Sequence, residues 1–386
     1  MSAWTPQVFT PYRDQPDILI ARVAARSAAF AGTSAAGGAP VLVGSAAGHD
    51  REQVAIGARG ELLERLGNVM AGREAEDAAE VVAAYGELRR KGIPALEPRT
   101  RPDTRRLWVR GRTTRGAELL VPAGSAFLHH RPPAGCDAAP SAGSTGVAAH
   151  PDLASAARHA AWEVLERDLV RRSWYGLADR PPTVIQAPVS SPLADFVRAG
   201  RLRATAFGVP SPAGTVCAVV CLHRPDGTGQ AFGARCGPAD TVPALVEKAT
   251  YEALMVRWSM RTPVARATWD RWHGSGPPAT AVQHALWAYH RQDSLGLWAV
   301  RPRPDGAGET AVRTDGVRPC PDGAGEITVR TDPLPVLAEH TGQDVILVET
   351  TAKSARDAGV RVVRVLAPGA LPLPSRTTSG HPHPFG

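Results

Sequence analysis

Two acidic motifs on predicted helices carry the residues of this chain that are best suited to chemistry. The sequence ELLER from Glu61 to Arg65 recurs as EVLER from Glu163 to Arg167. On a helix, two glutamates three residues apart project from one face and can reach the same ion. Such a like-charge pair is destabilising unless a cation lies between the carboxylates. The arrangement therefore suits Mg²⁺, which takes oxygen ligands from one or two carboxylates together with substrate phosphates.

A simpler interpretation of each motif stays open. Charged residues at this spacing are common on helix faces that are merely solvated, and either copy alone is typical of such a face. Two copies, each in an Ala-rich context, favour an ion site over two unrelated charged surfaces.

Capping signals place both motifs on helices. Asp50 followed by Gln53 predicts the start of a helix that runs to about Val69 and carries the first motif. Pro151 and Asp152 predict the start of the helix that carries the second motif. We therefore expect each pair of glutamates on the exposed or ligand-facing side of its own helix.

Two further helices are predicted from apolar periodicity. The first spans Glu74 to Lys91 and has an apolar stripe. The second covers residues 241–261, with Asp240 as its expected N-cap, and its Glu252 partly repeats the acidic motifs. By itself, this last helix is typical of an ordinary amphipathic element.

Apolar runs bounded by turn residues predict the strands, and the whole pattern predicts an α+β fold. We expect a mixed, mostly antiparallel sheet with packed helices and an internal pseudo-repeat marked by the two motif helices. Because no linker separates two cores, residues 1–386 are expected to form a single domain. The predicted strands and short C-terminal helices cover residues 18–26, 39–44, 105–114, 117–128, 215–223, 230–236, 332–342, 344–351, 353–359 and 360–369.

Composition limits the classes of protein to which the chain can belong. Its 386 residues, 43% of them apolar, suffice for a substantial core. It has no signal-peptide pattern and no apolar run of about eighteen residues, so we expect a cytoplasmic protein without a membrane segment. The net charge of +7 is spread along the chain and aromatic residues make up 5%, which argues against nucleic-acid binding.

Several segments carry no predicted chemistry. The five cysteines form no metal-ligand or disulfide pattern, and Cys217 and Cys221 are expected to be small core residues of a strand. The Gly-rich loop 31–38 lacks the spacing of a P-loop. Residues 300–333 form a tandem repeat that predicts a duplicated surface hairpin.

The Pro-rich tail, residues 371–386, differs from an ordinary fraying terminus. Between His381 and Phe385 it alternates Pro with His and Phe, which favours a stiff, extended segment able to reach into a site.

Together, these motifs and their order resemble the YcaO-domain family. The resemblance rests on ELLER, on the segment STGVAAH that leads to WEVLERD, on the helix with Glu252 and Arg257, on the VETT to VRVVRVLAPG ending and on the terminal PHPFG. It implies ATP and Mg²⁺ as cofactors. It also implies metal ligands at Glu61, Glu64, Glu163 and Glu166, and nucleotide-binding residues at Arg65, Ala148, Arg167, Glu252 and Arg257.

The Pro-rich terminus is similar to that of family members that form azolines in ribosomally made peptides. In such enzymes the tail lies against the active site, which implies catalytic roles for Pro382, His383, Pro384 and Phe385. The resemblance implies a precursor peptide as substrate, a separate ThiF-like protein that binds its leader, and a homodimer; an FMN dehydrogenase is a further candidate partner.

Alternatives to azoline formation stay open. Thioamide or amidine formation uses the same activated backbone with another nucleophile, and a degenerate copy could serve as a scaffold in a modification complex. The chain also departs from many family members, with His150-Pro151 in place of Gly-Asn, Met255 in place of a Gln, and Gly386 in place of a final Pro.

Overall fold

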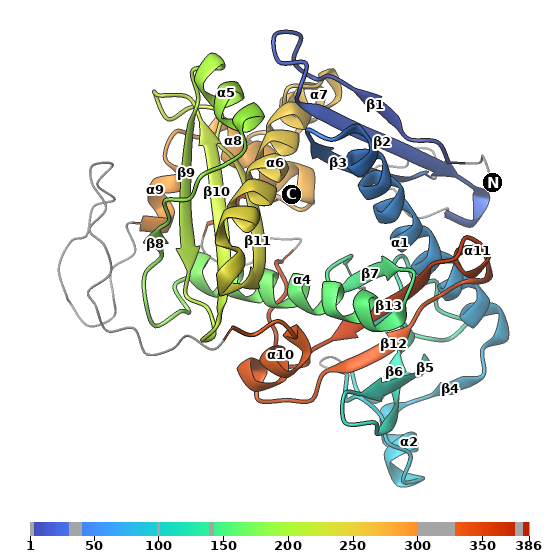
Figure 1. Ribbon diagram of the computed structural model, residues 1–386. Helices are drawn as coiled ribbons and strands as arrows, with labels where there is room; N and C mark the ends of the chain where they lie inside the picture. The colour runs from blue at the N-terminus through green and yellow to red at the C-terminus, as the bar shows by residue number, and fades with distance from the viewer. Residues whose placement is uncertain are drawn as a thin grey trace.

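The computed structural model describes residues 4–30, 41–98, 101–138, 143–299, 329–374 and 381–385. Within these residues, the strands form three sheets whose strand pairs are antiparallel, and helices pack on them (Figure 1). The predicted α+β fold is confirmed. The loop 31–38, Cys320 and residues 300–328 of the predicted hairpin lie outside the described residues.

The first sheet has the strand order β1-β2-β3, and the helix that carries ELLER packs on it. Its strands are β1 (Gln7–Phe9), β2 (Leu19–Arg26) and β3 (Val41–Gly48). The helix α1 (Arg51–Ala78) begins at Asp50, whose side chain accepts a hydrogen bond from the Gln53 amide at 2.9 Å. The capping signal in the sequence is therefore confirmed.

The second sheet has the order β11-β10-β9-β8 and is covered by the helix with Glu252. The two strands predicted at residues 215–223 and 230–236 pair antiparallel, with Cys217 opposite Cys236. The elements of this part are β8 (Thr183–Val184), α5 (Ser191–Ala199), β9 (Arg203–Val209), β10 (Thr215–His223), β11 (Ala231–Pro238) and α6 (Val242–Met260).

The third sheet combines strands from residues 81–150 with two strands near the C-terminus, because its order is β4-β5-β12-β13-β7 with β6 also paired to β5. Its strands are β4 (Val81–Ala83), β5 (Arg106–Thr113), β6 (Glu118–Pro122), β7 (Val147–His150), β12 (Ile346–Glu349) and β13 (Arg361–Leu366). The remaining helices are α2 (Tyr85–Arg90), α3 (Ala123–Ala126), α7 (Pro263–Trp272), α8 (Ala281–His290), α9 (Ser294–Ala299), α10 (Pro333–Thr341) and α11 (Lys353–Asp357).

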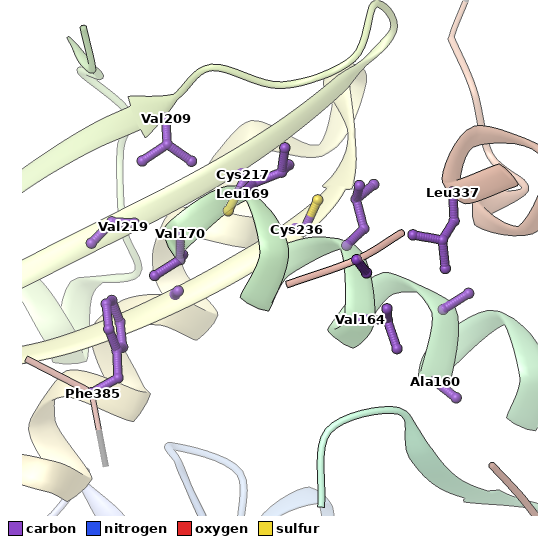
Figure 2. Packing of buried hydrophobic residues seen from close by; sticks show 14 of the residues in the cluster. Ala160, Val164, Leu169, Val170, Val209, Cys217, Val219, Cys236, Leu337 and Phe385 are labelled. Carbon is purple, nitrogen blue, oxygen red and sulfur yellow. The ribbon is translucent and has the colours of Figure 1, made fainter. Parts of the chain in front are cut away.

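The second motif lies on α4 (Leu153–Trp174), which packs against strands of both the second and the third sheet (Figure 1). Its apolar residues share one buried cluster with residues of β10, β11, β13 and α10, and Figure 2 shows Val164 and Leu169 among them. Because neighbours surround α4 on several sides, its apolar residues do not form a single stripe. This shared cluster supports the proposal that the chain forms one domain.

Two details of the predicted helices are wrong. The helix expected from Glu74 to Lys91 does not exist as such, because α1 continues to Ala78 and ends at Ala79, which adopts a left-handed conformation. Val81 then pairs with Trp108 in a strand, so apolar residues that fitted a helical stripe belong to a sheet. Asp240 lies in a 3₁₀ turn, and α6 begins only after Thr241.

Across the residues that the structure describes, every helix is too short or too polar to cross a membrane.

The close contact between β3 and α1 depends on Gly44. A Cβ atom at this position would lie 2.1 Å from the Ala58 carbonyl oxygen and 2.5 Å from the Leu62 amide nitrogen, both of them backbone atoms of α1. We therefore expect Gly44→Ala to push the helix off the strand and to lower the free energy of unfolding by about 1–3 kcal/mol. Urea unfolding followed by circular dichroism measures this loss.

Gly60, which lies inside α1, is the matched control. A Cβ atom there would have no atom within 4 Å of it. Gly60→Ala should therefore stabilise the protein by about 0.5–1 kcal/mol through helix propensity alone. Equal losses in the two variants would contradict the close-approach argument.

Candidate functional site

Three strand–helix pairs build the site in the same way. The strands β3, β7 and β11 lie at the edges of their sheets, and α1, α4 and α6 follow them in the chain. In each pair a helix glutamate accepts a hydrogen bond from a backbone amide in or just before the strand. The bonds run from Ser45 to Glu61, from Gly146 to Glu163 at 2.9 Å and from Ala234 to Glu252 at 3.1 Å.

A fourth bond connects two of these pairs. Glu166 of α4 accepts a hydrogen bond from the Cys236 amide of β11 through Oε2 at 3.1 Å. Its side chain is buried, and in the described part of the chain Oε1 has no hydrogen-bond partner. A buried carboxylate oxygen without a partner is costly, so it points to a ligand that supplies positive charge or a proton.

Glu64 of α1 lies close enough to Glu163 of α4 for their charges to interact. Burial raises its pKa well above the ordinary value, and the nearby Glu163 and Glu61 carboxylates raise it further, while Arg65 and Arg364 oppose the shift. The two motif helices therefore bring their glutamates close to one another. We call Glu61, Glu64, Glu163, Glu166 and Glu252 the glutamate cluster.

Arginines surround the glutamate cluster. Arg65 donates to Glu61 at 2.5 Å and to the Val43 carbonyl at 2.6 Å, which ties the first motif to β3. Arg364 of β13 donates to the Gly143 carbonyl at 2.6 Å, and burial lowers its pKa to about 10 although Glu163 and Glu64 oppose the shift. Arg167 lies 3.9 Å from Glu166.

Arg235 of β11 lies between two helices. Its Nη1 atom is 3.2 Å from Glu252 and 3.9 Å from Glu166. The carboxylate of Glu252 raises the pKa of Arg235, and the more distant glutamates of α4 and α1 add to the effect.

Two other residues predicted for nucleotide binding, Arg257 and Ala148, contact parts of the protein other than the glutamate cluster. Arg257 donates to the Gly229 carbonyl and faces the Tyr289 ring at 5.9 Å; the charged groups that affect its pKa include no member of the glutamate cluster. Ala148 is buried in β7, where it pairs with Val363. Their roles stay predictions.

The tail residues predicted to be catalytic fold back into the protein. Phe385 belongs to the buried cluster around α4, as Figure 2 shows, and its ring lies 6.1 Å from that of Phe232 in β11. His383 stacks on His284 with ring centroids 3.8 Å apart and bonds to the Pro374 carbonyl at 2.8 Å.

Burial lowers the pKa of His383 to about 3, helped by His284 and, more weakly, by Arg167. Its imidazole is therefore neutral at ordinary pH. Pro382 and Pro384 flank it, Pro382 half-buried and Pro384 buried. The tail thus packs near elements that carry the glutamate cluster, and its catalytic role stays a prediction.

Sequence reasoning missed Arg235, Arg364 and the amides that hold the glutamates. One signal was present. The amide donors Ser45, Gly146 and Ala234 precede their glutamates by 16, 17 and 18 residues, a regular spacing of strand, turn and helix. No comparable signal marked the two arginines: Arg364 comes from β13, and Arg235 directly follows Ala234 in β11 without any motif of its own.

The glutamate cluster fits a metal–polyphosphate complex better than a bare metal ion. Among the described residues, no three His, Cys, Asp or Glu side chains lie close enough to hold an ion by themselves. Mg²⁺ commonly uses one or two carboxylates and completes its shell with phosphate oxygens and water. The nearby arginines suit the same phosphates. These residues therefore fit a nucleotide that is bound together with Mg²⁺.

Comparison with known families is consistent with this interpretation. The family model described as YcaO cyclodehydratase, ATP- and Mg²⁺-binding, matches residues 45–371. The match spans most of the chain and includes the whole glutamate cluster. The chain belongs to the YcaO family, whose cofactors are ATP and Mg²⁺.

Solved structures share the fold at low sequence identity. YcaO from Methanopyrus kandleri bound with AMPPCP and Mg²⁺ is 20% identical, with a TM-score of 0.60 over 94% of this chain and 85% of that one. A heterocyclase in complex with substrate and cofactor is 17% identical, with a TM-score of 0.65 over 95% of this chain and 50% of that one. A chain of the E. coli microcin synthetase McbBCD complex is 13% identical, with a TM-score of 0.60 over 95% and 89%. No curated protein matches the chain.

The buried Glu166 predicts a pH-dependent difference between the wild type and Glu166→Gln without metal. Burial raises the pKa of Glu166 from 4.5 to about 7. The native state therefore holds a proton that the unfolded chain releases first, so the wild type loses stability as pH rises from 4.5 to 7. Glu166→Gln lacks this titration, and at pH 8 it should exceed the wild type by about 1–3 kcal/mol.

Urea unfolding in EDTA at several pH values measures the difference. It should shrink toward pH 4.5, where the wild-type carboxyl is protonated in the native state. A difference that is constant with pH, or that favours the wild type at pH 8, would contradict the pKa assigned to Glu166.

Proposed function

We propose that this chain is an ATP-dependent cyclodehydratase that converts Cys, Ser or Thr residues of a ribosomally made precursor peptide to azolines. The observation that carries the proposal is the glutamate cluster in a YcaO protein, in which Oε1 of the buried Glu166 has no hydrogen-bond partner among the described residues. The Pro-rich tail that packs beside α4 and β11 supports azolines as the product.

The proposed reaction activates a backbone amide. The side-chain sulfur or oxygen of the substrate residue adds to the preceding carbonyl carbon and gives up its proton. The resulting oxyanion attacks the γ-phosphorus of ATP and takes up the phosphoryl group, and ADP is the leaving group. Phosphate then departs with the former carbonyl oxygen, the amide nitrogen loses its proton, and a C=N bond completes the ring. The peptide thus loses one water for each ring.

The protein's part in this scheme is binding and charge stabilisation, which phosphoryl transfer chiefly requires. We assign Glu61, Glu64, Glu163 and Glu166 as the metal-binding residues. Bound Mg²⁺ would neutralise the phosphate charge that grows during transfer. We assign Arg167 to bind a phosphate oxygen, because it lies beside Glu166 and its Nε has no hydrogen-bond partner among the described residues.

Known complexes support the proposed partners. A heterocyclase in this fold is described with substrate and cofactor, and the microcin synthetase is a complex of several proteins. We propose that this chain acts on a precursor peptide, that a separate ThiF-like protein binds the leader, that an FMN dehydrogenase can act on the product, and that the enzyme is a homodimer.

Intact mass of the precursor peptide tests the reaction. Incubation with this protein, its ThiF-like partner, ATP and Mg²⁺ should lower the peptide mass by one water, about 18 Da, per modified residue. Glu166→Gln should lower the rate by at least about 100-fold because the metal site loses a charge. Glu118→Gln, which alters an exposed ion pair far from the cluster, should retain the wild-type rate.

Other masses identify the alternatives. Exchange of one oxygen for sulfur would show that the product is a thioamide. A product identified as an amidine would likewise replace the azoline proposal. An unchanged mass without ADP release would show that the chain is a scaffold. Product formation by Glu166→Gln at the wild-type rate would refute the metal assignment.

Dependence on a partner is tested separately. Because leader binding is assigned to another protein, this chain alone should bind the precursor at least about tenfold more weakly than the pair does. Fluorescence anisotropy with a labelled leader measures the binding. Tight binding and full activity of the isolated chain would show that it recognises the leader itself.

A further inference from the structure

Arg235 carries a positive charge beside the carboxylates of the glutamate cluster. It is within 4 Å of carboxylates from α4 and α6. The glutamates that raise its pKa also include Glu163 of α4 and Glu61 of α1. One guanidinium therefore pairs with carboxylates of two strand–helix pairs, where a bound metal ion would also balance the negative charge.

Its attachment differs from that of the neighbouring arginines. Arg65 and Arg364 each hold the backbone of a distant segment, at Val43 and Gly143. In the part of the chain that the structure describes, Arg235 bonds only to the carbonyl of the preceding residue, Ala234, at 3.1 Å, apart from its carboxylate contacts. Its side chain is 41% exposed, so it can turn toward solvent without leaving a buried cavity.

We propose that Arg235 stands in for magnesium in the metal-free protein and is displaced when the metal binds. The proposal rests on the metal assignment made above. Mg²⁺ and the guanidinium compete for Glu166, and two cations so close repel each other. The doubly charged ion holds the carboxylates more strongly, and the released guanidinium has phosphate oxygens as its next partners.

Competition between Arg235 and the metal predicts a different effect on metal binding than a purely structural role of Arg235. If Arg235 only held the glutamates in place, its removal would weaken metal binding. If it is a competitor, Arg235→Gln binds metal more tightly than the wild type, by about three- to tenfold. Arg235→Lys keeps a competing charge and should bind within about twofold of the wild type.

The experiment measures Mn²⁺ binding by electron paramagnetic resonance, with and without saturating AMPPCP. Arg112→Gln is the control for loss of one positive charge, because Arg112 is exposed and pairs with Glu118 on the third sheet. In parallel, Mn²⁺ should raise the thermal unfolding midpoint of Arg235→Gln more than that of the wild type, since the metal-free variant lacks its balancing cation.

Equal or weaker Mn²⁺ binding by Arg235→Gln overturns the proposal. If Glu166→Gln meanwhile loses both Mn²⁺ binding and product formation, the proposed function stands and only the role of Arg235 falls. If neither the wild type nor Arg235→Gln binds Mn²⁺, with or without AMPPCP, the placeholder role and the metal assignment fall together.

Discussion

The bond between an edge-strand amide and a helix glutamate is the interaction on which the site depends. An edge strand leaves amides without a partner, and such amides must be satisfied by some other acceptor. Here the acceptors are Glu61, Glu163 and Glu252 on the helices that follow. Because each bond uses one carboxylate oxygen, it fixes the orientation of the other. The same hydrogen bonds thus satisfy amides at the sheet edges and fix the positions of the carboxylates in the site.

The same arrangement has a cost in stability. Burial and mutual repulsion disfavour the charged forms of Glu64 and Glu166. The folded protein therefore keeps carboxylates close together that a purely structural core would avoid. Arg364 and Arg235 offset part of that repulsion. A site of this kind is more stable with its ligands than without them, since ligands that bind only the native state shift the folding equilibrium.

The sequence predicted the helices that carry Glu61 and Glu163 because caps and repeated motifs are local signals. It also predicted the strands at residues 215–223 and 230–236 and the C-terminal order of helix and strand. It failed between Glu74 and Lys91, where Val81 fits both a helical stripe and a short strand, and only pairing with β5 decides between them. Arg364 and the approach of Arg235 to Glu166 could not be found, since both depend on how separate elements pack together. The family resemblance suggested the roles of the tail, but not that Phe385 would be a core residue.

That burial of Phe385 affects when the protein can finish folding during synthesis. The cluster around α4 includes Val164 and Phe385, which are far apart in the sequence. At about 5–20 residues per second, the ribosome needs roughly ten seconds or more to reach Phe385 after α4 has been made. During that interval α4 and β11 lack one of their aromatic neighbours. The nascent chain therefore holds its acidic helix in an incompletely packed state until the tail arrives.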